Sequence, residues 1–532
     1  MPLDVRLEQG HKMHSGILGM RALATVLAAL ALASCGGGGG GGPIVNPGVM
    51  AQTCSRNNPY VGDATAPTTV GSITTEKTWL RDHFDRNYLW YTEVPNVDPS
   101  NAAFNNDTPT GFYTSIDNYF NALLTPAITA SGKFKDQFSF TYPTAAWDAL
   151  INSGSTVGYG IEWHFGSSVT PPRNIRVAYV HAGSQADNAG VRRGDTLVSA
   201  DGVSADDTTQ SGVDALNAAL FPASGSAHTL RLSRGPTTTN YQFVAGSVTL
   251  KSVQSQILNI NTAKVGYLLF NDHVLTAEPD LINAMAVLQN NNVSDLVLDL
   301  RYNGGGYLFI ASEVAYMIAG AARTNGMIFE TTLFNNKRSN ENSSSPFENV
   351  ACLPDASFQC TSNALLPTLN LPRVYVLVSG STCSASEAII NGLRGVDVDV
   401  RLIGSTTCGK PYGFFSQDNC GITYFPIEFQ GVNAKGFGDY ADGFIPGGTG
   451  AAASNVLGCA ANDDLDHALG DPAEGQLASA LAYRASGNST CLPLMAGSRV
   501  TPLAAGQAAA VAEGGVVKPA PLTNRNGRMP AR

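Results

Sequence analysis

The segment from Val374 to Lys410 constrains the fold of this chain more than any other. It opens with an apolar run of strand-forming residues, Val374–Val378, and continues through a Gly-Ser-Thr-Cys turn. The spacing of apolar residues then predicts an amphipathic helix from about Ser384 to Arg394. We therefore expect a strand buried on both faces that delivers Ser384 to the N-terminus of a helix.

A serine at this position is suited to nucleophilic chemistry. The first backbone N–H groups of a helix lack helical partners, and the helix dipole favours negative charge at that end. Both properties would stabilise an attacking alkoxide on Ser384 and the oxyanion that it forms. The alternative is structural, because Ser384 and Glu387 have the spacing of a capping box.

Lys410 makes the catalytic alternative stronger. A second short strand, Arg401–Ile403, leads into a glycine-containing loop that can turn sharply and carry Lys410 back toward the helix. A lysine can act as the general base for a serine when burial lowers its pKa toward neutrality. The alternative is an ordinary solvated lysine in a loop.

A third strand-to-loop junction lies upstream. The apolar strand that begins at Leu296 breaks into three glycines, Gly304–Gly306, before a predicted helix at about Leu308–Ala319. Glycines allow backbone N–H groups to approach a ligand closely, as an oxyanion hole requires, where one donor is worth about 3–4 kcal/mol. A turn or linker is the alternative for the glycines alone. The three strand-to-loop junctions together favour a catalytic site, with an oxyanion donor at the glycines, a nucleophile at Ser384 and a base at Lys410.

These motifs resemble the carboxy-terminal processing proteases, also called tail-specific proteases, which are Ser-Lys dyad serine peptidases. The family's Asp-Leu-Arg-x-Asn signature with its glycine-rich turn is matched by Asp299–Gly306. Its Ser-Ala-Ser-Glu turn is matched by Ser384–Glu387, and its Gly-Lys loop by Gly409–Lys410. The resemblance extends over roughly residues 76–494.

The resemblance implies a role for each matched residue. Ser384 would be the nucleophile, Lys410 the general base and Glu387 a third polar member. The oxyanion hole would be formed by backbone amides, those of Ala385 and of Gly304 or Gly305. The chain departs from the family pattern at three positions. The family often has Pro where this chain has Gly304 and Gly where it has Pro411, and many members have Gln where it has Phe414. These departures leave any third catalytic residue open.

The N-terminus has the pattern of a targeting segment. Arg21 precedes an apolar run, Ala22–Leu32, that is too short for a comfortable membrane span. Leu-Ala-Ser-Cys then ends at Cys35 and resembles a bacterial lipobox, which predicts a signal peptide over residues 1–35 and a lipidated Cys35. By resemblance to lipoprotein sorting, the absence of Asp after Cys35 favours a periplasm-facing outer-membrane lipoprotein of the bacterial cell envelope. A secreted or soluble periplasmic protein is the alternative.

The net charge and the cysteine content limit which classes of partner and cofactor are expected. The net charge of −10 argues against nucleic acid as a partner, and no later segment is apolar and long enough to span a bilayer, so membrane contact would be through the lipid anchor only. Eight cysteines besides Cys35 predict disulfides in an oxidising compartment. Proximity in sequence suggests Cys352–Cys360 and Cys408–Cys420. No metal-ligand spacing is present, so no metal or other cofactor is expected.

Composition and patterning divide the chain further. Residues 36–75 read as a flexible linker, 76–154 as a small helical region, 155–240 as a β-rich module, 241–495 as the catalytic domain and 496–532 as a disordered tail. The β-rich module resembles a PDZ domain. Its carboxylate-binding loop would consist of four residues, Gly158, Tyr159, Gly160 and Ile161, whose N–H groups would capture the C-terminus of a peptide.

The catalytic region alternates strands and helices, which predicts an α/β fold. The resemblance implies a crotonase-like form of that fold. Residues 325–359 are polar and are expected to form surface loops, and 472–483 to form a final helix with Asp471 as its N-cap. The histidines lie outside triad motifs, and His273 is expected to be structural.

We thus expect an exported serine endopeptidase that hydrolyses polypeptide substrates, recognised by their C-termini through the PDZ-like module. By resemblance, an activator or adaptor protein is a further class of partner. The alternative is a catalytically inactive peptide-binding or scaffold lipoprotein of the same fold.

Overall fold

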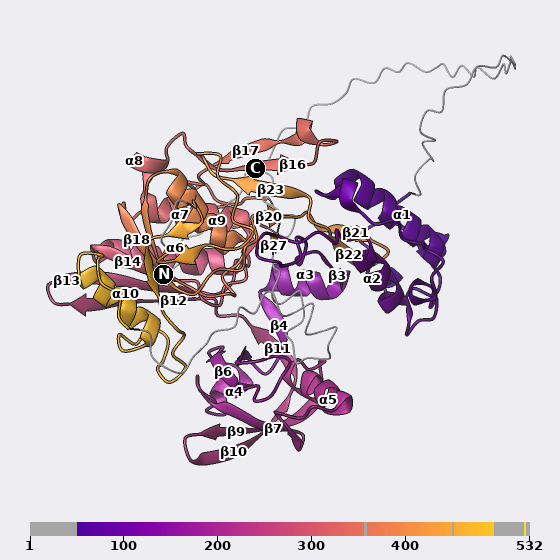
Figure 1. Ribbon diagram of the computed structural model, residues 1–532, viewed down its shortest axis with the longest axis horizontal. Coiled ribbons are helices and arrows are strands. Elements are labelled where there is room, and N and C mark those ends of the chain that lie inside the picture. Colours follow the sequence, from indigo (N-terminus) through magenta and orange to yellow (C-terminus); the bar gives the residue numbers. More distant parts are fainter. Residues whose placement is uncertain (1–49, 356–358, 449–451, 494–525, 528–532) are drawn as a thin grey trace, which may run out of the picture. The chain divides into compact units, whose positions relative to one another are not determined.

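The computed structural model describes residues 50–355, 359–448, 452–493 and 526–527 of the chain (Figure 1). The expected signal peptide with Cys35 lies outside the described residues, as does all of the expected tail except 526–527. Those two residues form a short strand, β27 (Asn526–Gly527), which pairs in parallel with β15 (Gly306–Tyr307). No helix in the described part of the chain has the length and apolar character needed to cross a membrane.

The catalytic region is built on a six-stranded sheet of order β12-β13-β14-β18-β19-β26. Only the β12–β13 pair is antiparallel, and the other neighbours are parallel. The expected α/β fold is therefore confirmed, and so are the strands predicted around 296, 374–378 and 401–403. The strands are β12 (Val253–Ile260), β13 (Ala263–Phe270), β14 (Asp295–Asp299), β18 (Arg373–Val378), β19 (Asp399–Gly404) and β26 (Gly458–Ala460).

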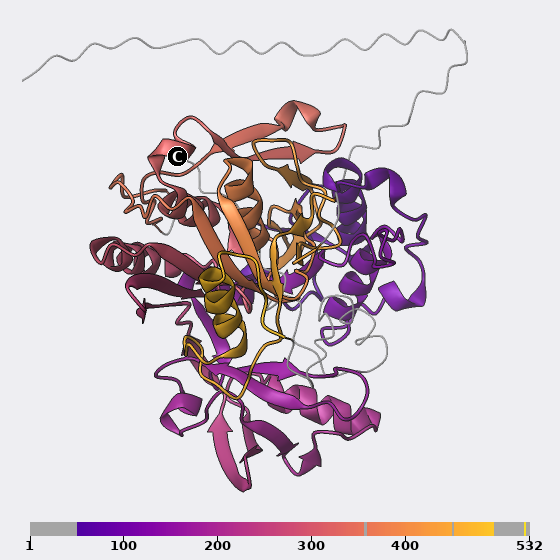
Figure 2. The same ribbon diagram turned by 60° about the vertical axis from the view of Figure 1, so that its left-hand side comes forward.

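Helices cover both faces of this sheet (Figure 2). Side chains alternate between the two faces of a strand, and Val376 packs into one apolar core while Tyr375 packs into another. Helices of the catalytic region that contribute to the first core include α6 (Ala277–Asn290), α7 (Leu308–Ala319) and α9 (Ala385–Gly395). The second contains α10 (Gly475–Ala485).

The start of α10 differs from the prediction. Asp471 is not the N-cap, because the helix begins at Gly475 and the side chain of Glu474 accepts a hydrogen bond from the Leu477 N–H. Glu474 is fully buried and also receives two hydrogen bonds from Arg301. The cap is thus placed by a long-range ion pair that the local Asp-Pro pattern does not report.

The expectation of surface loops over residues 325–359 is wrong for two segments. β16 (Ile328–Phe334) and β17 (Ser343–Pro346) form a hairpin in a four-stranded sheet of order β17-β16-β23-β20. The other two strands are β23 (Phe429–Val432) and β20 (Tyr412–Gly413). β16 is held as a strand because it pairs on both edges, which compensates for the polar sequence of its partner β17.

The N-terminal region is helical, as predicted, and is joined to the catalytic region. Its helices are α1 (Ile73–Asn87), α2 (Phe112–Ala122) and α3 (Thr144–Ser153). β3 (Phe140–Pro143) pairs with β22 (Ile422–Phe425) of the catalytic region. The expected linker also contains folded structure, since β1 (Thr53–Ser55) and β2 (Thr69–Gly71) pair within it.

The β-rich module has its own sheet, of order β10-β9-β7-β6-β5, and its own apolar core. Its main helix is α5 (Gln210–Leu220), and a short helix, α4 (Gln185–Asn188), follows the hairpin of β5 and β6 (Figure 1). The strands are β5 (Ile161–Phe165), β6 (Ile175–Val180), β7 (Thr196–Ala200), β9 (Ala227–Arg234) and β10 (Thr237–Val244). The antiparallel pair β4 (Ser155–Gly158) and β11 (Gly246–Thr249) brackets the module in the chain.

Four disulfides are present among the described residues, and they correct one prediction. Cys352–Cys360 is confirmed. Cys408 does not pair with Cys420, because Cys408 bonds to Cys383 and Cys420 bonds to Cys54. Parallel pairing of β18 and β19 places the turns that follow them side by side, which brings the Cα atoms of Cys383 and Cys408 to 5.2 Å. The fourth disulfide is Cys459–Cys491.

Candidate active site

The three glycine, serine and lysine segments leave the same edge of the main sheet. β14 pairs in parallel with β18, and β18 with β19, so the carboxyl ends of all three strands lie together. Gly304, Ser384 and Lys410 follow these three strands in turn. The carbonyl of Asn303 helps to join the first two segments, because it accepts hydrogen bonds from the N–H of Cys383 (3.0 Å) and from Oγ of Ser386 (3.1 Å).

Ser384 stands at the N-cap of α9 in a strained backbone conformation. Its φ is 62° and its ψ is −114°, a region that residues other than glycine rarely occupy. Such a conformation costs about 1–3 kcal/mol and is typical of functional turns. Ser384 and Glu387 do form the capping box that the sequence allows. The box and the strained turn coexist, so capping does not account for the backbone conformation of Ser384.

Glu387 ties the serine turn to the lysine loop. Its carboxylate accepts hydrogen bonds from the N–H of Ser384 (2.9 Å), of Gly409 (2.9 Å) and of Lys410 (2.8 Å). It also accepts one from Oγ1 of Thr407 (2.6 Å). Burial raises the pKa of Glu387, against these hydrogen bonds, which lower it. With its oxygens engaged in this way, Glu387 has the contacts of a group that positions the two segments.

The ammonium nitrogen of Lys410 is enclosed. Lys410 is 1% exposed, and its Nζ makes no hydrogen bond within the part of the chain that the structure describes. Nζ lies 4.5 Å from the ring centre of Phe414 and 5.2 Å from that of Phe138. Burial lowers the pKa of Lys410 to about 7, although the carboxylates of Asp136 and Glu387 favour its charged form. The interpretation of Lys410 as a solvated loop lysine is therefore wrong.

Two backbone N–H groups remain free for an oxyanion. In the described structure, no hydrogen bond engages the N–H of Gly304 or that of Ala385, the first residue of α9. The N–H of Gly305 is not free, because it donates to Oδ1 of Asn303 at 2.9 Å. Of the two glycine donors that the resemblance allowed, Gly304 is the available one.

His273 supports the glycine turn. It is fully buried, its Nδ1 lies 3.0 Å from Oδ1 of Asn303, and its N–H donates to the carbonyl of Gly305 (3.2 Å). Burial lowers the pKa of His273 to about 3, so its imidazole is neutral at physiological pH. These contacts agree with the structural role expected from the sequence.

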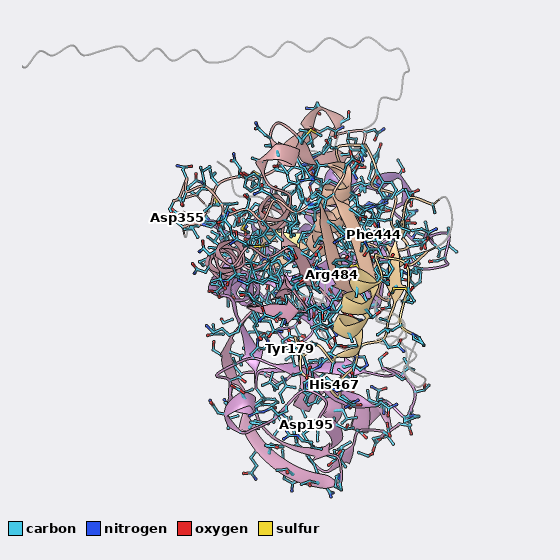
Figure 3. The ribbon with its side chains drawn as sticks, turned by 90° about the vertical axis from the view of Figure 1, so that its left-hand side faces the viewer. Tyr179, Asp195, Asp355, Phe444, His467 and Arg484 are labelled. Atoms are coloured by element: carbon cyan, nitrogen blue, oxygen red, sulfur yellow. A yellow bond between two sulfur atoms is a disulfide. The ribbon has the colours of Figure 1, made fainter. Side chains whose placement is uncertain are left out.

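The signature residues before the glycines form a buried charge network. Arg301 pairs with Asp299, Asp463 and Glu474, and Asp299 also accepts a hydrogen bond from Tyr267 (2.7 Å). The guanidinium of Arg193, from the β-rich module, bonds to Asp463 and to the hydroxyl of Tyr302. Arg193 Nε also donates a hydrogen bond to the backbone carbonyl of His467 (2.9 Å), a residue labelled in Figure 3.

The four residues expected to bind a peptide C-terminus lie in the β-rich module. Tyr159 and Gly160 connect β4 to β5, and β5 is the edge strand of its sheet. Gly160 has a φ of 89°, and a Cβ there would lie 2.2 Å from the side chain of Ser184, so only glycine fits. Gly158 ends β4 and Ile161 begins β5.

Two groups of residues have the donor spacing of a metal site among the described residues. One contains Cys383, Glu387 and Cys408, and the other contains Cys54, Glu76 and Cys420. In each group the two cysteines form a disulfide, so no thiolate is available to a metal. The chemistry of these donors therefore does not fit a metal ion.

Sequence reasoning missed the residues that surround the lysine from the N-terminal region. Asp136 and Phe138 lie more than 270 residues before Lys410 and carry no local signal. Asp136 is itself held by Tyr88 (2.7 Å) and by Oγ of Ser139 (2.6 Å). Phe414, noted in the sequence only as a departure from the family pattern, is in contact with the lysine.

Comparison with protein families gives two matches. Residues 264–415 match peptidase family S41, and residues 75–140 match the peptidase S41 N-terminal domain. The first range contains Gly304, Ser384 and Lys410, and the second includes Asp136 and Phe138.

Curated relatives carry related names. Over 263 residues the chain is 26% identical to a carboxyl-terminal-processing protease of Picosynechococcus, which covers 49% of this chain and 56% of that protein. Over 208 residues it is 29% identical to carboxyl-terminal-processing peptidase 2, chloroplastic, of Arabidopsis thaliana, which covers 38% of this chain and 36% of that protein. The matches thus span about half or less of these relatives.

A solved structure supports the fold. The crystal structure of a protein from Bacteroides fragilis described as an S41 protease superposes with a TM-score of 0.55, at 24% identity, over 77% of this chain and 98% of that chain. The family matches and this shared fold agree with the resemblance seen in the motifs. The chain therefore contains a peptidase S41 N-terminal domain at residues 75–140, followed by a peptidase family S41 domain at residues 264–415.

Proposed function

We propose that this protein is a serine endopeptidase in which Ser384 is the nucleophile and Lys410 the general base. One observation carries the proposal: the Lys410 amine is buried without a hydrogen-bond partner among the described residues, and its loop is clamped by Glu387 to the backbone of Ser384. A buried amine with a pKa of about 7 is neutral in a large fraction of molecules at neutral pH, as a base must be.

The reaction would proceed in two steps. Neutral Lys410 takes the hydroxyl proton of Ser384 as Oγ attacks the peptide carbonyl, and the N–H groups of Gly304 and Ala385 donate to the oxyanion. The Lys410 ammonium then protonates the departing amine, which leaves an ester on Ser384. Water, deprotonated by Lys410, hydrolyses that ester. Glu387 is a positioning residue in this scheme.

The proposal is tested with protein that lacks residues 1–35. We expect it to react with a fluorophosphonate probe at Ser384 and to cleave an unfolded protein such as reduced casein. Mass spectrometry of the labelled peptide would locate the modified residue. A folded protein that neither reacts nor cleaves would favour the alternative of an inactive peptide-binding relative.

The pH dependence of kcat/KM follows from Lys410. Since the base must be unprotonated and its pKa is lowered to about 7, activity should rise with pH through a single ionisation near 7 and stay high to about 9. A lysine with its ordinary pKa of about 10.4 would instead place the rise above pH 9. The measurement is kcat/KM for an uncharged peptide between pH 5 and pH 10. A rise only above pH 9 would contradict the neutral-lysine assignment.

We propose that the β-rich module is a PDZ-like domain that binds C-termini of polypeptide substrates. Support comes from the free edge of β5, to which a peptide could add as a strand, next to a loop with two glycines. Export as a lipoprotein anchored at Cys35, in the bacterial envelope, remains a prediction of the sequence. A requirement for an activator or adaptor protein likewise remains a prediction from the resemblance.

Arg193 should couple this module to the active site. Its guanidinium holds Tyr302 and Asp463 beside the Asn303–Gly304 turn. We expect Arg193→Met to lower kcat/KM about tenfold, because the turn that carries an oxyanion donor loses its support. The matched control is Arg192→Met, since the Arg192 side chain is 57% exposed whereas that of Arg193 is 8% exposed. Equal activities of the two variants would contradict the coupling.

A further inference from the structure

A pocket with an unpaired carboxylate lies beside the candidate dyad, Ser384 and Lys410. The pocket has a volume of about 140 Å³, and Glu330 lines it together with five aromatic residues, Phe329, Phe334, Phe414, Phe415 and Phe429. We call it the Glu330 pocket. Cavities of about this size hold a benzene-sized group, which corresponds to one side chain of a peptide.

The pocket is connected to the dyad by Phe414. This ring lines the pocket and also lies 4.5 Å from Nζ of Lys410. A second lining residue, Leu308, follows the glycine turn by two residues. A substrate residue close to the scissile bond is therefore the natural occupant.

Sheet register places Glu330 on the pocket face. Every second residue of a strand points to the same face, and on β16 the pocket is lined by Glu330, Thr332 and Phe334. Glu330 lies opposite Ser345 of β17, which also lines the pocket. Gly431 of the neighbouring β23 leaves room for the carboxylate, because a Cβ there would lie 2.4 Å from it.

Glu330 lacks the partner that a buried carboxylate normally has. It is 8% exposed, and its side chain makes no hydrogen bond or salt bridge within the described residues. Burial alone raises its pKa to about 7. The contrast is Glu428, which is also buried and whose pKa is also about 7, but which is bonded to Arg338. Arg338 is paired with Glu341 and Glu428 and is not available to Glu330.

We propose that the Glu330 pocket binds the cationic side chain of a Lys or Arg residue of the substrate next to the scissile bond, with Glu330 as the counter-ion. The aromatic walls would contact the aliphatic stem and attract the cation through their ring faces. An apolar side chain would leave the carboxylate unpaired, and an acidic one would repel it. This inference rests on the proposed peptidase function.

The test is a map of cleavage sites in reduced casein by wild type, Glu330→Gln and Ser345→Ala. We expect wild type to show Lys or Arg enriched at one fixed position beside the cleaved bonds. In matched peptides that differ only there, wild type should prefer Lys over norleucine at least about tenfold in kcat/KM, and Glu330→Gln should lose that preference. Ser345→Ala alters the same pocket but removes no charge, so this variant should keep the preference for Lys over norleucine.

Two kinds of failure can be told apart. If wild type cleaves but shows no enrichment of Lys or Arg, or if Glu330→Gln keeps the same Lys-to-norleucine ratio, the inference about the pocket is overturned while the peptidase stands. If wild type neither cleaves nor reacts with the fluorophosphonate probe, the proposed function itself fails and this inference fails with it. Fluorophosphonate labelling of Glu330→Gln at the wild-type rate would show that its dyad is intact.

Discussion

Replacement of Ser384 by Ala, or of Lys410 by Met, should abolish peptide hydrolysis. We expect kcat to fall by at least about a thousandfold in each variant, because a nucleophile and its base act as one unit. Methionine is chosen for Lys410 since it fills the site between Phe138 and Phe414 without a titratable group. The double variant should be no worse than either single variant, which is the behaviour of residues that act together.

The measurement is the cleavage rate of an unfolded protein, together with the rate of fluorophosphonate labelling. The controls are Ser381→Ala, in the same turn, and Lys435→Met, whose lysine is half exposed and pairs with Asp397 at the surface. Both controls should keep near wild-type rates. Hydrolysis that survives in Ser384→Ala would contradict the assignment of the nucleophile, and full activity in Lys410→Met would contradict that of the base.

Loss of the Cys383–Cys408 disulfide should have the second-largest effect. This bond joins the residue before Ser384 to the loop that carries Lys410, in parallel with the Glu387 clamp. We expect the variant Cys383→Ser with Cys408→Ser to lose about 2–4 kcal/mol of unfolding free energy, as is typical for a disulfide. Its kcat should fall about tenfold or more, because the two reacting groups are then held less firmly.

The matched control removes the Cys352–Cys360 disulfide. Its two cysteines are 8 residues apart in the sequence, whereas Cys383 and Cys408 are 25 residues apart. That variant should be less destabilised and should keep its kcat, since no residue of the candidate dyad adjoins it. Unfolding in urea and peptide cleavage are measured on both variants. A Cys383/Cys408 variant as active as wild type would show that the Glu387 clamp alone positions the dyad.

The sequence by itself determined the local parts of the site. Apolar runs at Val374–Val378 and around Leu296 predict strands, and the residues after them predict turns, because these signals depend on neighbours a few residues apart. The main sheet is parallel here, so consecutive strand ends meet at one edge and bring the glycine, serine and lysine segments together. For this reason motif reasoning located the segments without knowledge of their contacts.

The tertiary structure decided which groups surround those residues. Asp136 and Phe138 reach Lys410 because β3, two residues beyond Phe138, pairs with β22, a contact between segments about 280 residues apart. A different tertiary contact, the parallel pairing of β18 with β19, puts Cys383 next to Cys408. No pattern of sequence neighbours reports such contacts, since they depend on how whole elements pack.

Chemical detail at the site also depended on the fold. The N–H of Gly305 is taken by the side chain of Asn303, which leaves Gly304 as the free glycine donor. The segment around β16 and β17 forms a hairpin whose pocket contains Glu330, because pairing with β16 holds β17 as a strand despite the polar sequence of β17. Residue types and their order are local properties, whereas burial, pairing and the pKa of Lys410 arise only when distant segments exclude water together.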